Sequence, residues 1–305
     1  MENVKLVVGV EEVGDSDFPT SPPSENFEQV VSVIKSPPKV VFLIPYRNRE
    51  EHLRVYMNQM NYILEDVPAT EYEFYIVHQD DSRPFNRGAM KNIGFLYVKN
   101  KYPNDYLDIT LVFNDVDTTP KDKNHIDYRT TRGVIKHYYG FTFALGGIVS
   151  ITGADFEKTS GFPNFWAWGY EDNLLNTRAI QCGIHIDRSV FCDISVDKKQ
   201  TGFVSLSSGL FRDVNKNEFV RYMGKTKEGI HHIQNIRLAV DASRVLPDEY
   251  TFPCHIEVLN ISGFDTGVLP PSYNTTQYDL RKGATPFGKV MYRRNGRVPL
   301  VDMIL

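Results

Sequence analysis

Two aspartates follow an apolar segment near the middle of the chain. Ile109–Phe113 is rich in β-branched and aromatic residues, as buried strands are, and Asp115 and Asp117 follow within four residues. Pro120 is expected to prevent the strand from continuing. The carboxyl ends of strands are where open α/β sheets bind ligands, and paired carboxylates can hold a divalent cation that also binds diphosphate oxygens. Aspartate is equally common in solvated turns, so this pair needs support from other residues.

A second acidic pair, Glu171 and Asp172, follows a loop that contains both tryptophans of the chain, Trp166 and Trp168. Acids in the first turn of a helix complement its dipole and accept from its free N–H groups, which is the purely structural explanation. Aromatic rings beside carboxylates also suit sugars, whose C–H faces stack on rings while their hydroxyls donate to acids. The loop therefore predicts a carbohydrate site, with core packing of one tryptophan as the alternative.

Three arginines follow the first two predicted strands, Arg47 and Arg49 after the first and Arg87 after the second. A guanidinium fork matches the oxygens of a phosphate group, although any single surface arginine is usually just solvated. The carboxyl ends of neighbouring parallel strands lie at one edge of a sheet. We therefore expect the three arginines to lie near Asp117 and to bind phosphate.

The first part of the chain alternates strand and helix patterns. Strands are predicted at Val40–Ile44, Phe74–Val77 and Ile109–Phe113, with amphipathic helices between them. Asn48 and Asn86 are predicted to cap these two helices, Asn48 with a glutamate three residues later. This alternation implies βαβ crossovers and an α/β fold with a mainly parallel central sheet flanked by helices.

The second half of the chain has three further features that bear on a site. Gly146–Ile151 is predicted to be a strand whose glycines permit close approach of another backbone. The helix that begins at Glu171 is expected to end at Gly183. Asp197–Lys216 is polar and contains several Gly and Ser, so we expect a mobile loop that closes over a bound substrate.

No phosphate-binding glycine motif follows the first predicted strand, neither Gly-x-Gly-x-x-Gly nor a P-loop. This absence disfavours a dinucleotide oxidoreductase or a P-loop nucleotidase, and it favours phosphates held by a metal ion at Asp115 and Asp117. A phosphate-cleaving hydrolase is also disfavoured, because the sequence has no second metal-binding cluster and no His-rich motif.

Composition excludes several other classes. The 305 residues carry a net charge of −4, so we expect neither a nucleic-acid partner nor attraction to an anionic membrane. No apolar run approaches the roughly 20 residues of a membrane span, and the N-terminus lacks the pattern of a signal peptide. Cys182, Cys192 and Cys254 are too few and too widely spaced for a disulfide framework. We therefore expect a cytoplasmic protein.

Five segments occur in an order that resembles the β-1,4-galactosyltransferase family, and the resemblance extends over about residues 39–262. The ordered set is far more specific than any one of its members. The segments are Pro45-Tyr46-Arg47-Asn48-Arg49-Glu50-Glu51-His52-Leu53, Phe85-Asn86-Arg87-Gly88, Asn92-Ile93-Gly94-Phe95, Phe113-Asn114-Asp115-Val116-Asp117, and Gly161-Phe162-Pro163-Asn164 together with Trp168-Gly169-Tyr170-Glu171-Asp172.

The resemblance implies a GT-A fold and transfer of a hexose, with galactose as the expected sugar, from a UDP-sugar to a saccharide acceptor with inversion. It implies a Mn²⁺ or another divalent cation at Asp117 and a catalytic base at Asp172 beside Glu171. The implied donor-binding residues are Pro45, Tyr46, Arg47, Arg49, Phe85, Arg87, Asp115, Val116 and Trp168. The implied acceptor-binding residues are Trp168, Gly169, Tyr170, Glu171 and Asp172.

Three departures from the family pattern qualify these expectations. Tyr170 replaces a glycine, and Asn173 replaces the acid that follows Asp172 in the family. The residue near Phe143 that helps the family distinguish galactose from its N-acetylated analogue falls in a shorter stretch here, so the sugar stays open. The family completes its metal site with a Met and a His, which the corresponding stretch Phe191–Lys199 lacks. Substitute ligands could come from Asp193, Asp197, His185 or His231.

The missing Met and His support a rival hypothesis, a non-catalytic sugar- or nucleotide-binding module with a degraded metal site. In either case three parts of the chain are expected. Residues 1–38, rich in Pro, Ser and acids, form an N-terminal appendage with a possible short strand at Val4–Val10. Residues 39–262 form the glycosyltransferase domain, and residues 263–305 form a loosely structured extension.

Overall fold

The sheet is built around β2 (Val40–Tyr46), whose seven residues are all buried. Such a continuous apolar strand fits the centre of a sheet that is covered on both faces. It pairs in parallel with β3 (Tyr72–Gln79) on one side and with β4 (Thr110–Asn114) on the other. The computed structural model describes residues 7–8, 36–166, 168–197, 199, 202–206, 216–242, 245–246 and 252–268. The three strands predicted in the first part of the chain are confirmed.

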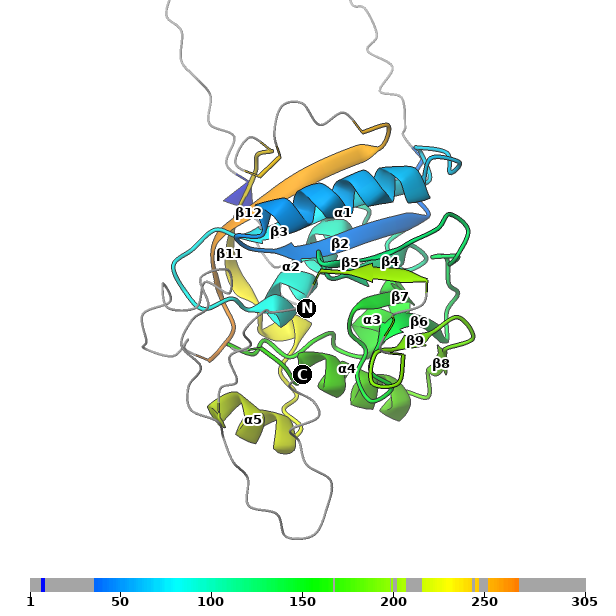
Figure 1. Cartoon of the computed structure of the whole chain (residues 1–305). Coiled ribbons are helices and arrows are strands. Elements are labelled where there is room, and N and C mark those ends of the chain that lie inside the picture. Colours follow the sequence, from blue (N-terminus) through cyan, green and yellow to red (C-terminus); the bar gives the residue numbers. More distant parts are fainter. Residues whose placement is uncertain are drawn as a thin grey trace, which may run out of the picture.

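The strand order within the described residues is β1-β11-β12-β3-β2-β4-β7-β6-β8, and β9 also pairs with β6 (Figure 1). The four central strands β12, β3, β2 and β4 are parallel, whereas β7 and β11 run antiparallel to their central neighbours. The bounds of the outer strands are β1 Val7–Val8, β6 Val134–Gly140, β7 Ile148–Thr152, β8 His185–Asp187, β9 Cys192–Asp193, β11 Gln234–Val240 and β12 His255–Asp265. The sheet is therefore mainly parallel at its centre, as predicted.

Helices cover both faces of the central strands. Alternate side chains of β2 and β3 point to opposite faces, and they divide the core into two clusters. One cluster packs under α1 (Glu50–Ile63) and the other under α2 (Arg87–Lys101), and α1 lies across the strands in Figure 1. The remaining helices are α3 Gly153–Lys158, α4 Glu171–Gln181, α5 Lys216–Met223 and the short 3₁₀ turn η1 Ile230–His232.

Helix caps were predicted with mixed success. The side chain of Asn86 accepts a hydrogen bond from the backbone N–H of Ala89, so this cap of α2 is confirmed. Asn48 is not a cap, because its φ of 49° places it in a left-handed turn and α1 begins only at Glu50. Gly183 has a φ of 69° just beyond α4, so the predicted end of that helix is confirmed.

Two segments that were expected to be irregular contain short strands. Pro120 lies within β5 (Thr118–Pro120), which pairs antiparallel with β10 (Phe203–Ser205) inside the predicted loop Asp197–Lys216. A proline removes only its own N–H donor, and here Lys121 N–H continues the ladder by donating to the carbonyl of Gly202. Residues 207–215, in the rest of that predicted loop, lie outside the described residues.

The C-terminal expectation also needs correction. Gly263 does not begin a loosely structured extension, because β12 continues to Asp265 with its residues paired to β11. Val7–Val8, within the short strand expected at Val4–Val10, pairs in parallel with β11. Residues 1–6, 9–35 and 269–305 lie outside the described residues, so the proposed division into three parts stays a prediction.

None of the helices in the described ranges has the length and apolar character needed to cross a bilayer.

The cap of α2 yields a test of the fold. We expect Asn86→Ala to lower the free energy of unfolding by about 2 kcal/mol, because it removes a helix cap and a buried amide. That amide donates to the carbonyl of Asn164 at 3.1 Å. Chemical denaturation measures the change, and Asn58→Ala on the exposed side of α1 is the matched control. Equal stabilities of the two variants would contradict the assignment of Asn86 as a cap.

Candidate functional site

Arg87, the first residue of α2, binds three carboxylates from two segments of the chain, one after β4 and one at the start of α4. Its Nε donates to Glu171 Oε1 at 2.7 Å, one Nη donates to Asp172 Oδ2 at 2.7 Å, and the other donates to Asp115 Oδ2 at 3.2 Å. Burial by itself lowers the pKa of Arg87, but the three carboxylates outweigh it and hold the pKa well above its usual value. Arg87 is therefore the cation at the centre of the candidate site.

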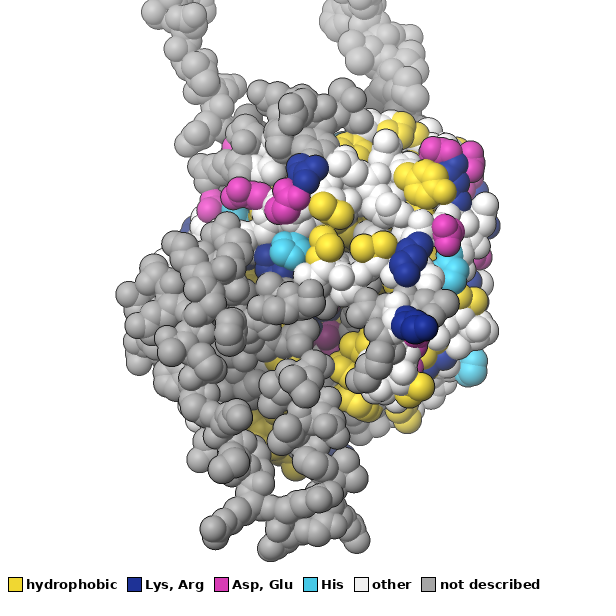
Figure 2. Space-filling view, in the orientation of Figure 1, with side chains coloured by type: hydrophobic (Ala, Val, Ile, Leu, Met, Phe, Trp, Pro, Cys, Tyr) yellow, Lys and Arg dark blue, Asp and Glu magenta, His cyan; other side chains and the backbone are white. Residues whose placement is uncertain are grey.

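The topology explains why these residues meet. Parallel strands place their carboxyl ends at one edge of the sheet, so Arg87 after β3 lies beside Asp115 after β4. The amino end of α4 brings Glu171 and Asp172 to the same edge. On the face in Figure 2, an acidic side chain is visible deep in a hollow between the levels of β5 and α4, with hydrophobic side chains along its lower edge.

Asp117 lies beside this cluster, next to the charge of Asp115 and close to Arg49. Burial and then repulsion from Asp115 raise the pKa of Asp117, while Arg49 and Arg87 partly oppose the rise. Arg49 Nη1 is 3.8 Å from Asp117 Oδ2. The backbone N–H of Leu206, just after β10, donates to the carbonyl of Asp117 at 2.8 Å. Two acids that repel each other in a buried position form a natural place for an added cation.

Glu171 is the most deeply buried acid of the cluster, with an exposed fraction of 1%. Burial raises its pKa, Arg87 opposes this rise, and the adjacent charge of Asp172 adds to it. Among the described residues its Oε2 has no hydrogen-bond partner. A buried acceptor of this kind can accept a hydroxyl group of a ligand, as the sequence analysis expects of Glu171.

Lys91 is a member of the cluster that the sequence analysis missed. It lies one turn after Arg87 on α2, and its Nζ is 3.0 Å from Asp172 Oδ1 and 3.8 Å from Asp115 Oδ1. Only 2% of its surface is exposed, and its ammonium group also lies 4.5 Å from the centre of the Phe162 ring. Its spacing of four residues from Arg87 was the available signal, because such residues share one face of a helix.

The predicted arginine set is only partly correct. Arg49 and Arg87 join the acidic cluster, but Arg47 binds the backbone carbonyl groups of Asp81 and Arg83 in the loop after β3. The other expected donor-binding residues line the same edge as mostly buried side chains. They are Pro45 and Tyr46 at the end of β2, Phe85 before α2 and Val116 after β4.

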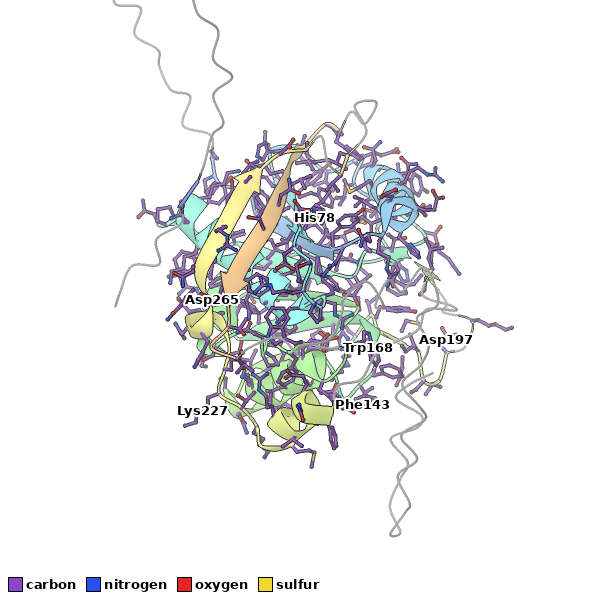
Figure 3. The ribbon with its side chains drawn as sticks, turned by 90° about the vertical axis from the view of Figure 1, so that its left-hand side faces the viewer. His78, Phe143, Trp168, Asp197, Lys227 and Asp265 are labelled. Atoms are coloured by element: carbon purple, nitrogen blue, oxygen red, sulfur yellow. The ribbon has the colours of Figure 1, made fainter. Side chains whose placement is uncertain are left out.

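The two tryptophans have different roles. Trp166 is a core residue, because only 1% of its surface is exposed, it stacks on Phe264, and its indole N–H donates to the carbonyl of Val268. Its part in a carbohydrate site is therefore wrong, and the alternative of core packing holds. Trp168 is half-buried in the loop that precedes α4, where Figure 3 labels it.

Tyr170 ends the aromatic loop in a left-handed backbone conformation, with a φ of 70°. This conformation costs a non-glycine residue about 1 kcal/mol. Its ring packs on two aromatic rings of α5, those of Phe219 at 5.1 Å and Tyr222 at 4.9 Å between ring centres. Gly169, with a φ of 98°, provides the turn that lets the loop approach α4.

Gly146 and His137 support Asp172 from the opposite side. A Cβ atom on Gly146 would lie 2.4 Å from Asp172 Oδ2, so only glycine permits this contact. The N–H of Leu145 donates to the carbonyl of Asp172 at 2.9 Å. His137 Nδ1 accepts from Arg188 at 3.1 Å, so Nε2 carries the proton and donates to the carbonyl of Gly146 at 3.0 Å. The close backbone approach predicted for this glycine pair is confirmed at Gly147, where a Cβ atom would lie 2.3 Å from the carbonyl oxygen of Tyr139.

His137 is held neutral. Burial, and then the charge of Arg188, lower the pKa of His137 to about 3. The histidine therefore fixes the Gly146 segment with a hydrogen-bonding pattern that protonation would break, because Nδ1 could no longer accept from Arg188.

The described residues contain no group of three His, Cys, Asp or Glu side chains arranged to hold a metal ion. The four substitute ligands considered from the sequence therefore do not complete a site with Asp117 here. Asp193 and Asp197 accept hydrogen bonds within their own turns, and Asp197 lies toward the edge of the molecule in Figure 3. His185 and His231 are exposed.

The carboxylates that are present still suit a divalent cation. Mn²⁺ and Mg²⁺ prefer oxygen ligands, and they are often bound by one or two carboxylates together with phosphate oxygens of a substrate. Asp117, with Asp115 beside it, has this donor chemistry and an unfavourable repulsion that a cation would relieve. The residues fit a metal that is completed by a bound diphosphate.

The central sheet and its flanking helices have the architecture of the GT-A fold. Comparison with solved structures supports this architecture: the catalytic domain of Drosophila β1,4-galactosyltransferase 7 in complex with xylobiose aligns with a TM-score of 0.56 and 20% identity. The alignment covers 74% of this chain and 94% of that chain. A mutant of the same enzyme, in complex with manganese, UDP-Gal and xylobiose, aligns with a TM-score of 0.54 and 19% identity.

Two family models match consecutive parts of the sequence. The N-terminal region of glycosyl transferase group 7 matches residues 32–129, and the N-terminal domain of galactosyltransferase matches residues 130–215. Together these matches cover more than half of the 305 residues. The chain therefore belongs to the β-1,4-galactosyltransferase family, as the ordered motifs indicated.

Curated relatives give the same result over part of their length. β-1,4-Galactosyltransferase 5 of Mus musculus is 33% identical over 159 residues, and β-1,4-galactosyltransferase 1 of the same species is 34% identical over 163 residues. These alignments cover 49% and 50% of this chain, but only 40% and 39% of the relatives. The chain thus matches about two fifths of the length of these relatives.

The neutral state of His137 predicts a pH dependence of stability. Its pKa is about 3 when folded and near its usual value of about 6.5 when unfolded, so the unfolded chain binds the proton more tightly. The stability it contributes is complete above about pH 6.5 and is lost as the pH falls toward 3. As the pH falls through this window, we expect the free energy of unfolding of wild type to decrease by up to about 1.4 kcal/mol per pH unit more than that of His137→Gln.

Denaturation curves at a series of pH values measure this difference. The exposed His185→Gln is the control, and we expect it to keep the pH dependence of wild type. Parallel stability curves for wild type and His137→Gln between pH 6.5 and 3 would contradict the assignment.

Proposed function

We propose that this protein transfers a hexose, with galactose as the first candidate, from a UDP-sugar to a saccharide acceptor with inversion at the sugar. The observation that carries the proposal is the binding of one guanidinium, that of Arg87, to Asp115 on one side and to Glu171 and Asp172 on the other. Membership of the galactosyltransferase family supports the same activity. A relative's solved complex with manganese, UDP-Gal and xylobiose suggests the donor to test first.

The donor diphosphate binds at the edge formed by Arg49, Arg87, Asp115 and Asp117. Arg87 and Arg49 offer guanidinium groups to its phosphate oxygens, because a guanidinium fork matches the geometry of phosphate as well as that of the carboxylates that it contacts here. Asp117, with Asp115 beside it, holds a divalent cation. When bound, this ion supplies neutralisation of the charge that develops on the leaving diphosphate.

The acceptor binds on the opposite side of Arg87, where α4 begins. Glu171 accepts from a sugar hydroxyl through its buried Oε2, and the half-buried Trp168 offers a ring for the C–H face of a sugar. Asp172 acts as the general base. A new bond forms between the acceptor oxygen and the anomeric carbon, the bond from that carbon to the diphosphate oxygen breaks with its electron pair leaving on UDP, and the acceptor proton moves to Asp172.

The two acids should be separable by experiment. We expect Asp117→Asn to weaken Mn²⁺-dependent UDP binding at least tenfold, because it removes a cation ligand. We expect Asp172→Asn to bind UDP as wild type does but to transfer sugar about 10²–10⁴-fold more slowly, because it lacks the base. Isothermal titration and a transfer assay with UDP-galactose and a panel of saccharides measure both, with the exposed Asp108→Asn as control.

Two results would redirect the proposal. If Asp117→Asn bound UDP as tightly as wild type in the presence of Mn²⁺, Asp117 would not be a ligand of the metal ion. Normal UDP binding by wild type, together with no transfer and no donor hydrolysis over a panel of UDP-sugars, would support the rival non-catalytic module.

Gly146 gives a test that leaves the acids themselves in place. We expect Gly146→Ala to lower kcat about 10²-fold, because the new methyl group displaces Asp172 Oδ2 by the order of an ångström. UDP binding should change by less than about threefold, or about 0.6 kcal/mol. Gly224→Ala is the matched control, because a Cβ atom there meets only ordinary contacts at 3.5 Å and beyond. An unchanged kcat in Gly146→Ala would contradict the role of Asp172 as the general base.

A further inference from the structure

Lys91 is a buried cation that none of the five family-like motifs contains. It lies on α2 among Ala89, Met90, Asn92 and Ile93, all of which are buried, and only 2% of its own surface is exposed. Burying an unpaired ammonium group is very unfavourable, so such a group persists only with close anionic partners. The partners are Asp172 at 3.0 Å and, more distantly, Asp115 at 3.8 Å.

The two oxygens of the Asp172 carboxylate have different partners. Oδ1 accepts from Lys91 Nζ, and Oδ2 accepts from Arg87, whose guanidinium also serves Asp115 and Glu171. Arg87 is 17% exposed in its side chain and reaches the edge where the diphosphate binds in the proposed function, whereas Lys91 is almost fully enclosed. A ligand at that edge can therefore compete for Arg87 but has little access to Lys91.

We propose that Lys91 is a positioning residue that fixes Oδ1 of Asp172, so that Oδ2 is the oxygen that meets the acceptor hydroxyl. This inference rests on the proposed function and adds an assignment of single atoms. When a diphosphate takes over the hydrogen bonds of Arg87, Oδ2 loses its partner while Oδ1 keeps Lys91. The carboxylate then stays in place with one oxygen available for a proton.

The geometry limits the possible roles of Lys91. Lys91 is almost fully enclosed, with Asp172 as its near partner and the Phe162 ring beside it, so we assign it no contact with the reacting atoms and no proton transfer in the step. The proton moves from the acceptor oxygen to Asp172 Oδ2 as the new glycosidic bond forms and UDP leaves. In this proposal the effect of Lys91 on the rate passes through Asp172.

This dependence can be tested by a double-mutant cycle. We expect Lys91→Met to lower kcat at least 50-fold, while UDP binding with Mn²⁺ and the acceptor KM change less than threefold. In an Asp172→Asn background the same change should lower kcat less than threefold, because the carboxylate on which Lys91 acts is already absent. A general loss of structure would lower kcat equally in both backgrounds.

Two further variants complete the experiment. Lys99→Met, at a partly exposed position of the same helix and paired with Glu157 instead of Asp172, is the matched control and should keep the kcat of wild type. Lys91→Gln keeps a hydrogen-bond donor toward Oδ1 without the charge, and we expect it to recover part of the lost kcat. It also serves as the test variant if Lys91→Met does not fold.

The outcomes separate this inference from the function on which it rests. Absence of transfer by wild type would overturn both. Active wild type, with Lys91→Met or Lys91→Gln either unaffected in kcat or equally impaired in both backgrounds, would overturn the positioning role and leave the transferase intact.

Discussion

The ion pairing of Arg87 with three carboxylates is the interaction on which the site depends. Around it, Arg49 and Lys91 bring the cations to three, and Asp117 brings the carboxylates to four. When all seven groups are ionised, the charges balance to within one unit, which allows so many charges to lie together with little water. A ligand that enters this edge must therefore exchange partners with the protein rather than simply occupy an empty place.

The fold places these charges at one edge by simple means. Parallel pairing of β2, β3 and β4 brings the segments that follow them to a common edge, and α2 presents two cations one helical turn apart. The antiparallel strand β7 then places Gly146, two residues before its start, against Asp172 in the first turn of α4. Close packing at this glycine, as well as charge, therefore holds Glu171 and Asp172 in place. Asp115 on one side and Glu171 and Asp172 on the other are thus linked through Arg87 at the edge of the sheet.

The sequence was informative where a signal was local and uninformative where it depended on distant partners. Strand periodicity and the Asn86 cap depend on neighbours in the chain, and both were predicted correctly. Lys91 was missed because its partner lies 81 residues away, and a lysine on a helix is normally exposed. Trp166 was misjudged because its core contacts come from Phe264 and Val268, and the strand Thr118–Pro120 was missed because its partner lies in a polar segment.

The left-handed backbone of Tyr170 ties the acidic turn to a distant part of the chain. A glycine at this position would adopt the same turn freely, whereas tyrosine accepts a steric cost that its stacking on α5 can offset. Tyrosine at this position therefore makes the turn before α4 more rigid than glycine would. Because Tyr170 packs on α5, a displacement of α5 would also shift the first turn of α4, which carries Glu171 and Asp172. The position of α5 therefore influences the position of these two carboxylates.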